Sequence, residues 1–387
     1  MSESQLPNLR KRRQNETSRS ESERQKRSHQ LNESHPPHTT TTATEDIGNS
    51  GAYSSNFQQT LIDGGIYPYG YRYPDGRAPP KPNNWDEINQ RLMQPVPSLS
   101  PSAFSDEKFE EFVQADEDAD NEEAVRDSVI TKLLDVISGP HRARKNVRFS
   151  NLYPLNDLDW NTLKWAQPDY YYGAKGLFLN NMVDNMFGCY IAPSNGGLIL
   201  PNLFIEAKGP LGQFGGVKLQ ACYDGAIGTR AMHSLQSFAQ RTPAYDNKAY
   251  TISATYHNGK LKMYSHYTTH PNRPGTRPEY YMHQLISFAM TGTKESHLQG
   301  LTALQNAADW AREMRDAVIG QANETALRMA FEKIDAKLSS TTSRYAHGTT
   351  SLTLNSLIDD ESETPMDEPW KNYYSRSELL NLLSPCG

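Results

Sequence analysis

Cysteine is scarce in this sequence, and its scarcity excludes two kinds of stabilising framework. The 387 residues include three cysteines, Cys189, Cys222 and Cys386. None of them forms a CxxC pair or has histidine partners at zinc-finger spacing. The pattern excludes a disulfide framework and a structural zinc site, and it is typical of an intracellular protein.

Long apolar runs and an excess of positive charge are also missing. No apolar stretch approaches the ~18 residues that a membrane-spanning helix needs, and the polar start Met1 to Ser4 lacks the apolar core of a secretory signal. We therefore expect neither a membrane partner nor secretion. The formal net charge of -6 excludes a uniformly basic nucleic-acid binder, but it is compatible with a local basic face.

Apolar residues make up only 36% of the chain, and the polar excess lies mainly at its two ends. Such segments cannot bury enough apolar surface to offset the entropy lost on ordering. The composition predicts a disordered arm over residues 1–118, one folded domain over 119–338, and a disordered acidic tail over 339–387.

Two basic clusters in the predicted arm have the spacing of a bipartite nuclear-import signal. The first contains Arg10, Lys11, Arg12 and Arg13, and the second contains Arg24, Lys26 and Arg27. They predict a nuclear location with an import receptor as partner. The alternative is a pair of solvated charge runs in a cytoplasmic protein.

Hydrophobic periodicity predicts alternating helices and strands in the domain. The predicted helices cover residues 121–138 with Asp120 as the N-cap, 217–239, 280–290 and 301–337, and the predicted strands cover 188–192, 198–209, 250–256 and 261–267. This order predicts an α/β (α+β) fold in which helices flank a central mixed sheet.

The strand from Leu203 to Lys208 carries two charged residues among apolar ones. Side chains alternate along a strand, so Glu206 and Lys208 project from the same face. Burying them together is costly unless they pair or bind an ion. They form either an interior ion pair or part of a reactive site.

Pro168-Asp169 and Glu206-Ala207-Lys208 resemble the signature of the PD-(D/E)xK nuclease superfamily. The placement agrees with the resemblance, because the acid-x-Lys lies on an apolar strand, a helix precedes Pro168 and another helix begins near Gln220. The resemblance covers about residues 122–267. More narrowly, residues 200–210 and 220–226 are similar to a group of fungal nuclease-like proteins.

The resemblance implies a restriction-endonuclease-like core that hydrolyses phosphodiester bonds of DNA. It implies that Asp169 and Glu206 hold Mg²⁺ or Mn²⁺, and that Lys208 orients the attacking water or stabilises developing charge. The superfamily often adds an acidic residue from the first helix. Glu122 is the candidate for this role, with Glu123 in reserve.

Nucleic-acid contacts are expected on the helix that follows the strand. One branch of the superfamily places a Gln and a Tyr there with three residues between them, whereas Gln220 and Tyr223 have two between them. Gln220, Tyr223 and Arg230 nevertheless share one broad helical face. The alternative function is a catalytically inactive nuclease-fold module for nuclear DNA binding or protein interaction, which the missing basic excess favours.

Overall fold

The computed structural model describes residues 56–149, 166–191, 197–212, 214–240, 242–271 and 277–345, without the side chains at 186–190, 214 and 339–345. All of these residues lie in one compact unit. The α-helices are α1 (Phe57–Asp63), α2 (Trp85–Leu92), α3 (Asp106–Asp118), α4 (Glu122–Ala124), α5 (Thr131–Leu134), α6 (Asn181–Ile191), α7 (Phe214–Gln236) and α8 (Lys294–Tyr345). Two short 3₁₀ turns cover Pro97–Leu99 and Gly176–Phe178, and a π-helical turn, Val125–Ile130, joins α4 to α5. The strands are β1 (Ile66–Tyr67), β2 (Ala143–Lys145), β3 (Tyr170–Ala174), β4 (Ile199–Lys208), β5 (Ala249–His257), β6 (Lys260–Thr269) and β7 (Glu279–Ala289).

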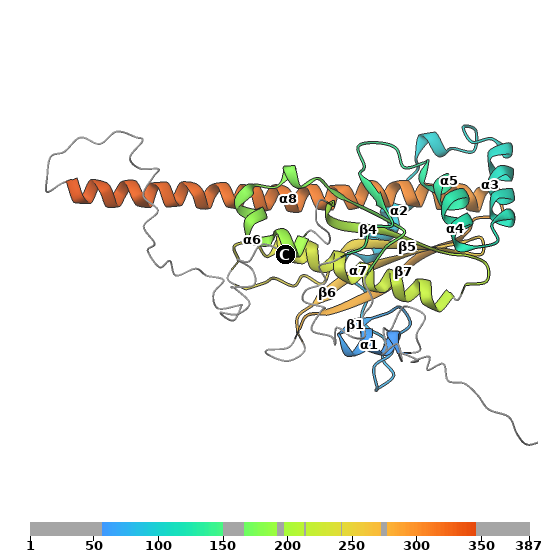
Figure 1. Cartoon of the computed structure of the whole chain (residues 1–387), viewed down its shortest axis with the longest axis horizontal. Coiled ribbons are helices and arrows are strands. Elements are labelled where there is room, and N and C mark those ends of the chain that lie inside the picture. Colours follow the sequence, from blue (N-terminus) through green and yellow to red (C-terminus); the bar gives the residue numbers. More distant parts are fainter. Residues whose placement is uncertain are drawn as a thin grey trace, which may run out of the picture. The chain divides into compact units, whose positions relative to one another are not determined.

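The described strands form one seven-stranded mixed sheet in the order β1-β7-β6-β5-β4-β3-β2 (Figure 1). The β4–β5 and β1–β7 pairs are parallel, and the other neighbours are antiparallel. Helix α7 provides the crossover that a parallel β4–β5 pair requires. The predicted α/β fold with a central mixed sheet flanked by helices is confirmed.

Helices cover both faces of the sheet, which explains why β4 is almost continuously apolar. Leu203, Ile205 and Ala207 point into a core shared with α2, α3 and α8. Phe204 points to the opposite face, into a core shared with α1 and α7. The alternation along β4 therefore places Glu206 and Lys208 on the α7 side of the sheet.

The first predicted helix begins later and ends earlier than expected. Asn121, and not Asp120, caps it, since Asn121 Oδ1 accepts a hydrogen bond from the Ala124 amide at 2.9 Å. The helical segment ends at Leu134, and its middle is π-helical. Val125, Val129, Ile130 and Leu133 of this segment are buried, and Val136 and Ile137 are partly buried against the same core.

Two secondary-structure predictions were wrong. Residues 279–289 form strand β7 where a helix was expected at 280–290, since β7 pairs with β6 along its whole length. Tertiary pairing and the aromatic residues of this segment outweigh its helix-like spacing of apolar positions. Residues 188–191 belong to helix α6, where a strand was expected at 188–192.

The expected disordered arm is wrong for residues 56–118. These residues form α1 to α3 and β1, and Ile88, Leu92 and Phe112 are buried in the main core. A few well-placed apolar residues suffice because the sheet and α8 already offer a surface to cover. The tail prediction is wrong for 339–345, where α8 continues. The two basic clusters and residues 346–387 lie outside the described residues.

Candidate functional site

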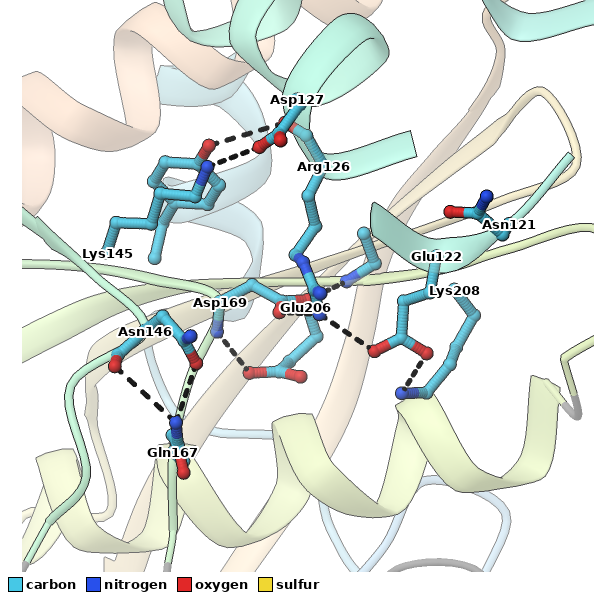
Figure 2. A network of polar contacts seen from close by, with 12 residues as sticks. Asn121, Glu122, Arg126, Asp127, Lys145, Asn146, Gln167, Asp169, Glu206 and Lys208 are labelled. Carbon is cyan, nitrogen blue, oxygen red and sulfur yellow. Dashed lines mark hydrogen bonds and ion pairs between the residues drawn. The ribbon is translucent and has the colours of Figure 1, made fainter. Parts of the chain in front are cut away.

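Asp169 and Glu206 meet at the edge between β3 and β4. Tyr170 is paired with Ile205, so Asp169, just before β3, lies beside Glu206. The Asp169 amide donates to Glu206 Oε1 at 3.1 Å, and the Ala207 amide donates to Asp169 Oδ2 at 2.8 Å. Both side chains are buried. Two strands thus hold the two predicted metal ligands in fixed positions (Figure 2).

Lys208 and Glu122 form an ion pair at the end of β4. Lys208 Nζ lies 2.7 Å from Glu122 Oε2. The side chain of Lys208 is 2% exposed, whereas that of Glu122 is 33% exposed. Gly209 allows the first turn of α4 to approach this closely, since a Cβ there would lie 2.7 Å from the Glu122 amide nitrogen. The predicted lysine and the predicted helix carboxylate are therefore brought together.

Arg126, which the sequence reasoning missed, joins the two halves of this network. Its Nη1 lies 3.0 Å from Glu122 Oε1 and 3.1 Å from Asp169 Oδ1 (Figure 2). The residue belongs to the π-helical turn, a feature that often marks functional segments of helices. The signal was present in the sequence, because Glu122 and Arg126 have the i,i+4 spacing of a helical ion pair.

Asp224 on α7 is a second residue that the sequence reasoning missed. Its buried side chain shares a hydrogen bond with the carboxyl group of Glu206. Burial, and then the neighbouring carboxylates of Asp224 and Asp169, raise the pKa of Glu206 well above its ordinary value. Burial raises the pKa of Asp224 to about 7. Two buried carboxyl groups in contact cannot both be ionised without a cation, so this pair shares a proton near neutral pH.

The network holds more acidic than basic groups. The cations of Arg126 and Lys208 pair with Glu122 and Asp169, and the network also contains the carboxyl groups of Glu206 and Asp224. Burial raises the pKa of Asp169 too, although the Ala207 amide and the Arg126 guanidinium oppose this effect.

Oxygen donors with excess negative charge suit a hard cation such as Mg²⁺. No three His, Cys, Asp or Glu side chains of the described part of the chain are already arranged as a metal site. The donor set nevertheless fits Mg²⁺ in its chemistry.

Residues 113–322 match the model of a family described as a domain of unknown function, DUF7924. This match covers more than half of the chain. The chain belongs to the DUF7924 family. All six residues of the network lie within the matched range. No curated protein and no solved structure is significantly similar to the chain.

Two of the three residues predicted to contact nucleic acid lie in the core of the DUF7924 domain. Tyr223 is 3% exposed, and its ring packs edge-on against Phe57 at 6.1 Å. Arg230 is 2% exposed. Neither side chain can reach a nucleic acid in this conformation, because α7 turns that face toward the sheet. Gln220 is half-buried, and Glu123 is exposed.

A hollow of about 290 Å³ opens beside Lys208 on the DUF7924 domain. Its lining includes the acidic residues Asp116, Glu117 and Asp120. Three carboxylates beside one lysine repel phosphate groups.

Strand β2, at the edge of the sheet, carries several basic side chains. Arg142, Arg144, Lys145 and Arg148 are exposed on and beside this strand. Its neighbour β3 follows directly after Asp169, and the Asn146 amide donates to the Asp169 carbonyl at 3.0 Å. The DUF7924 domain thus has the local basic face that its net charge allowed, next to the acidic network.

Among the described helices, none combines the length and the apolar character needed to cross a bilayer.

Proposed function

We propose that this chain is a metal-dependent nuclease that hydrolyses phosphodiester bonds of DNA. The observation that carries the proposal is the convergence of Glu122, Asp169, Glu206 and Lys208 in one buried network. These residues come from α4, from the start of β3 and from β4. They are the residues that the PD-(D/E)xK resemblance selects, and chance matches to a short signature have no reason to converge in space.

Each side chain of the network has a role in this proposal. Asp169 and Glu206 would hold Mg²⁺ or Mn²⁺, which when bound supplies an activated water and neutralises charge on the phosphate. Lys208 orients that water or stabilises the charge that develops on the phosphate. Glu122 holds the Lys208 ammonium in position. Asp224 orients the Glu206 carboxyl group through their shared hydrogen bond.

DNA as the substrate is supported by the basic edge strand. Arg142, Arg144 and Lys145 are exposed next to the segment that carries Asp169. Such side chains bind the phosphate backbone without reading its sequence. A strand of nucleic acid lying along β2 places a phosphodiester near the acidic network.

A second candidate function is a catalytically inactive module that binds DNA or another protein. The observation that favours it is that the charged groups of the network already form ion pairs with one another. Arg126 binds both Glu122 and Asp169, and Lys208 binds Glu122, so cations of the chain already occupy carboxylate oxygens. Such a network stabilises the fold without any reaction.

A nuclear location with an import receptor as partner belongs to the same proposal. It depends on the clusters Arg10–Arg13 and Arg24–Arg27. Replacing both clusters with alanine is expected to abolish nuclear accumulation of a tagged chain in fluorescence imaging. Unchanged accumulation of that variant would contradict the import role.

The decisive experiment compares cleavage by four proteins. The parent, Asp169→Asn, Glu206→Gln and the control Asp127→Asn are incubated with single-stranded DNA, double-stranded DNA and RNA, in Mg²⁺, Mn²⁺ or a chelator. Asp127 is a suitable control because it is an exposed acid on the same helical segment, paired with Lys145 outside the network. The parent and the control are expected to cut DNA only with metal, and the two network variants are expected to be inactive.

Thermal melting separates the two candidate functions. A nuclease is expected to melt at a higher temperature with Mg²⁺, and this shift is expected to vanish in Asp169→Asn and Glu206→Gln. Melting that does not depend on metal, together with DNA binding but no cleavage, would establish the inactive module instead.

A further inference from the structure

The C-terminal part of α8 carries a row of large apolar side chains that are about half exposed or more. Leu327, Phe331, Ile334 and Leu338 are 53, 65, 52 and 47% exposed. Figure 1 shows no other described helix or strand along this end of α8. Single exposed apolar residues are ordinary, whereas a contiguous row marks an interaction surface. The family match ends at residue 322, so this row lies beyond the shared domain.

The spacing of the row is that of a coiled-coil seam. Its members follow one another after four, three and four residues, which is the alternation of a and d positions in a heptad. Val318, Ala322 and Ala326 form the stripe that α8 turns toward its own domain. Leu327 directly follows Ala326 and is therefore rotated by about 100° around the helix. The exposed seam thus lies to one side of the stripe that the domain covers.

We propose that this seam pairs with the same seam of a second copy of the chain, as an antiparallel two-stranded coiled coil about a two-fold axis. In this register Phe331 lies opposite the partner's Ile334, and Leu327 lies opposite the partner's Leu338. Large and branched side chains then alternate across the interface, and the contact is self-complementary, as a two-fold axis requires.

Charge complementarity selects a second copy and an antiparallel direction. Arg328 and Asp335 follow Leu327 and Ile334 directly, so both flank the seam on the same side. In an antiparallel pair this side meets the same side of the partner. Arg328 then faces the partner's Asp335, and the two-fold axis repeats this ion pair, so that the interface contains it two times. A parallel pair would place Asp335 against the partner's Ala330. Arg328 makes only a loose 3.8 Å contact with Glu332 and is two-thirds exposed, so it can reach across the seam.

The antiparallel direction also keeps the folded domains apart. Because α8 is packed into its own domain up to Ala326, an antiparallel partner places its domain beyond the far end of the seam. A parallel partner would bring both domains to the same end. The seam is already helical as a continuation of α8, so association does not include the cost of starting a helix.

Sedimentation of the full chain over about 1 to 100 µM tests the proposal, a range suited to a short interface. The expected result is a mass that rises with concentration from 43.6 kDa toward twice that value. Phe331→Glu and Ile334→Glu are each expected to weaken association by about tenfold or more. Ala336→Glu introduces the same residue on the face of α8 away from the seam, and this control is expected to associate like the parent.

A charge swap tests the partner and the direction. Arg328→Asp places two acids opposite each other and is expected to weaken the dimer, and the double variant Arg328→Asp with Asp335→Arg is expected to restore it. Circular dichroism of each variant verifies that the helix persists. A monomeric parent at every concentration, a dimer that Phe331→Glu leaves intact, or a double variant as weak as Arg328→Asp would each overturn the proposal.

Discussion

Two polar clusters lie on the same face of the sheet, under neighbouring residues of α7, and they differ in charge and in access to solvent. Asp224 meets Glu206 of β4, and the adjacent Gly225 packs on His266 of β6. In the second cluster, Ser253 and His266 are joined by one hydrogen bond of 2.7 Å between Oγ and Nε2. Both residues of that pair are fully buried.

The difference separates a structural cluster from a candidate reactive one. Burial, and then the neighbouring His283, lower the pKa of His266 to about 3, so the Ser253–His266 pair is neutral and satisfied. The acidic network instead concentrates carboxyl groups of raised pKa and reaches solvent through Glu122 and Arg126. Carboxyl groups with strongly shifted pKa values concentrate at functional sites, which makes the acidic network the candidate.

The largest expected difference between the two clusters is in cleavage. Lys208→Ala removes the compact cation of the acidic network and is expected to lower the cleavage rate by on the order of 10² or more, the scale for one preorganised electrostatic group. Ser253→Ala, in the neutral cluster, is expected to leave cleavage unchanged. Steady-state assays on the substrate that the parent cuts measure both.

A different result is expected for Lys208→Ala if Lys208 only stabilises the fold. Removing it would then lower the free energy of unfolding and leave cleavage per folded molecule unchanged. Urea titration of Lys208→Ala, with the exposed Lys145→Ala as control, separates the two roles. A large loss of stability with full activity would contradict the catalytic role.

A smaller effect is expected from crowding the neutral cluster. A Cβ at Gly225 would lie 2.2 Å from the His266 ring, so Gly225→Ala is expected to destabilise the fold by about 1–3 kcal/mol, as overpacking does. Gly215, on the same helix, has open space around the corresponding Cβ position, so Gly215→Ala is the matched control. Equal melting of the two variants would show that α7 can shift away from β6.

The sequence predicted the chemistry of β4 better than the network around it. Strand alternation was sufficient to place Glu206 and Lys208 on one face, because that property is local. Asp169 entered only through the resemblance, since its contact with Glu206 depends on the β3–β4 register. Arg126 and Asp224 were missed because their roles come from packing between elements, although Asp224 stands at the three-residue gap from Gln220 where the resemblance expects a tyrosine.

The sequence-based predictions of the fold were least accurate for segments whose structure depends on long-range packing. Residues 279–289 have helix-like spacing, yet pairing with β6 makes them a strand. The segment 56–118 has too few apolar residues to fold alone, yet Ile88, Leu92 and Phe112 are buried against surfaces that later parts of the chain provide. Neither outcome is encoded within a local window of sequence.

Opposite responses to pH are expected from the two clusters. The pKa of Asp224 rises from 3.8 to about 7 on folding, so the stability it contributes is complete below pH 3.8 and is lost as the pH rises through about 7. The pKa of His266 falls from 6.5 to about 3, so its contribution is complete above pH 6.5 and is lost as the pH falls toward 3. Each proton changes the free energy of unfolding by at most about 1.4 kcal/mol per pH unit.

Urea unfolding in a chelator measures these slopes. Between pH 5 and 8, Asp224→Asn is expected to remove a fall in stability that the parent shows, and Mg²⁺ is expected to remove it in the parent as well. His266→Gln is expected to change only the acid side. Identical pH profiles for the parent and Asp224→Asn would mean that the carboxyl pair does not share a proton.

The smallest expected effect concerns the basic strand β2, which lies beside the acidic network and not beside the Ser253–His266 pair. If Arg144 contacts one phosphate, Arg144→Ala is expected to weaken DNA binding by about fivefold near physiological salt and to reduce the slope of log K against log salt by about one. Fluorescence anisotropy in a chelator measures binding without cleavage. Ser253→Ala is the control, because the buried neutral pair cannot contact a phosphate.

Arg144 is exposed and lies outside the network, so the Arg144→Ala variant is expected to melt like the parent. An unchanged salt slope would mean that DNA does not lie along β2, and the approach to Asp169 would then have to be sought on another edge.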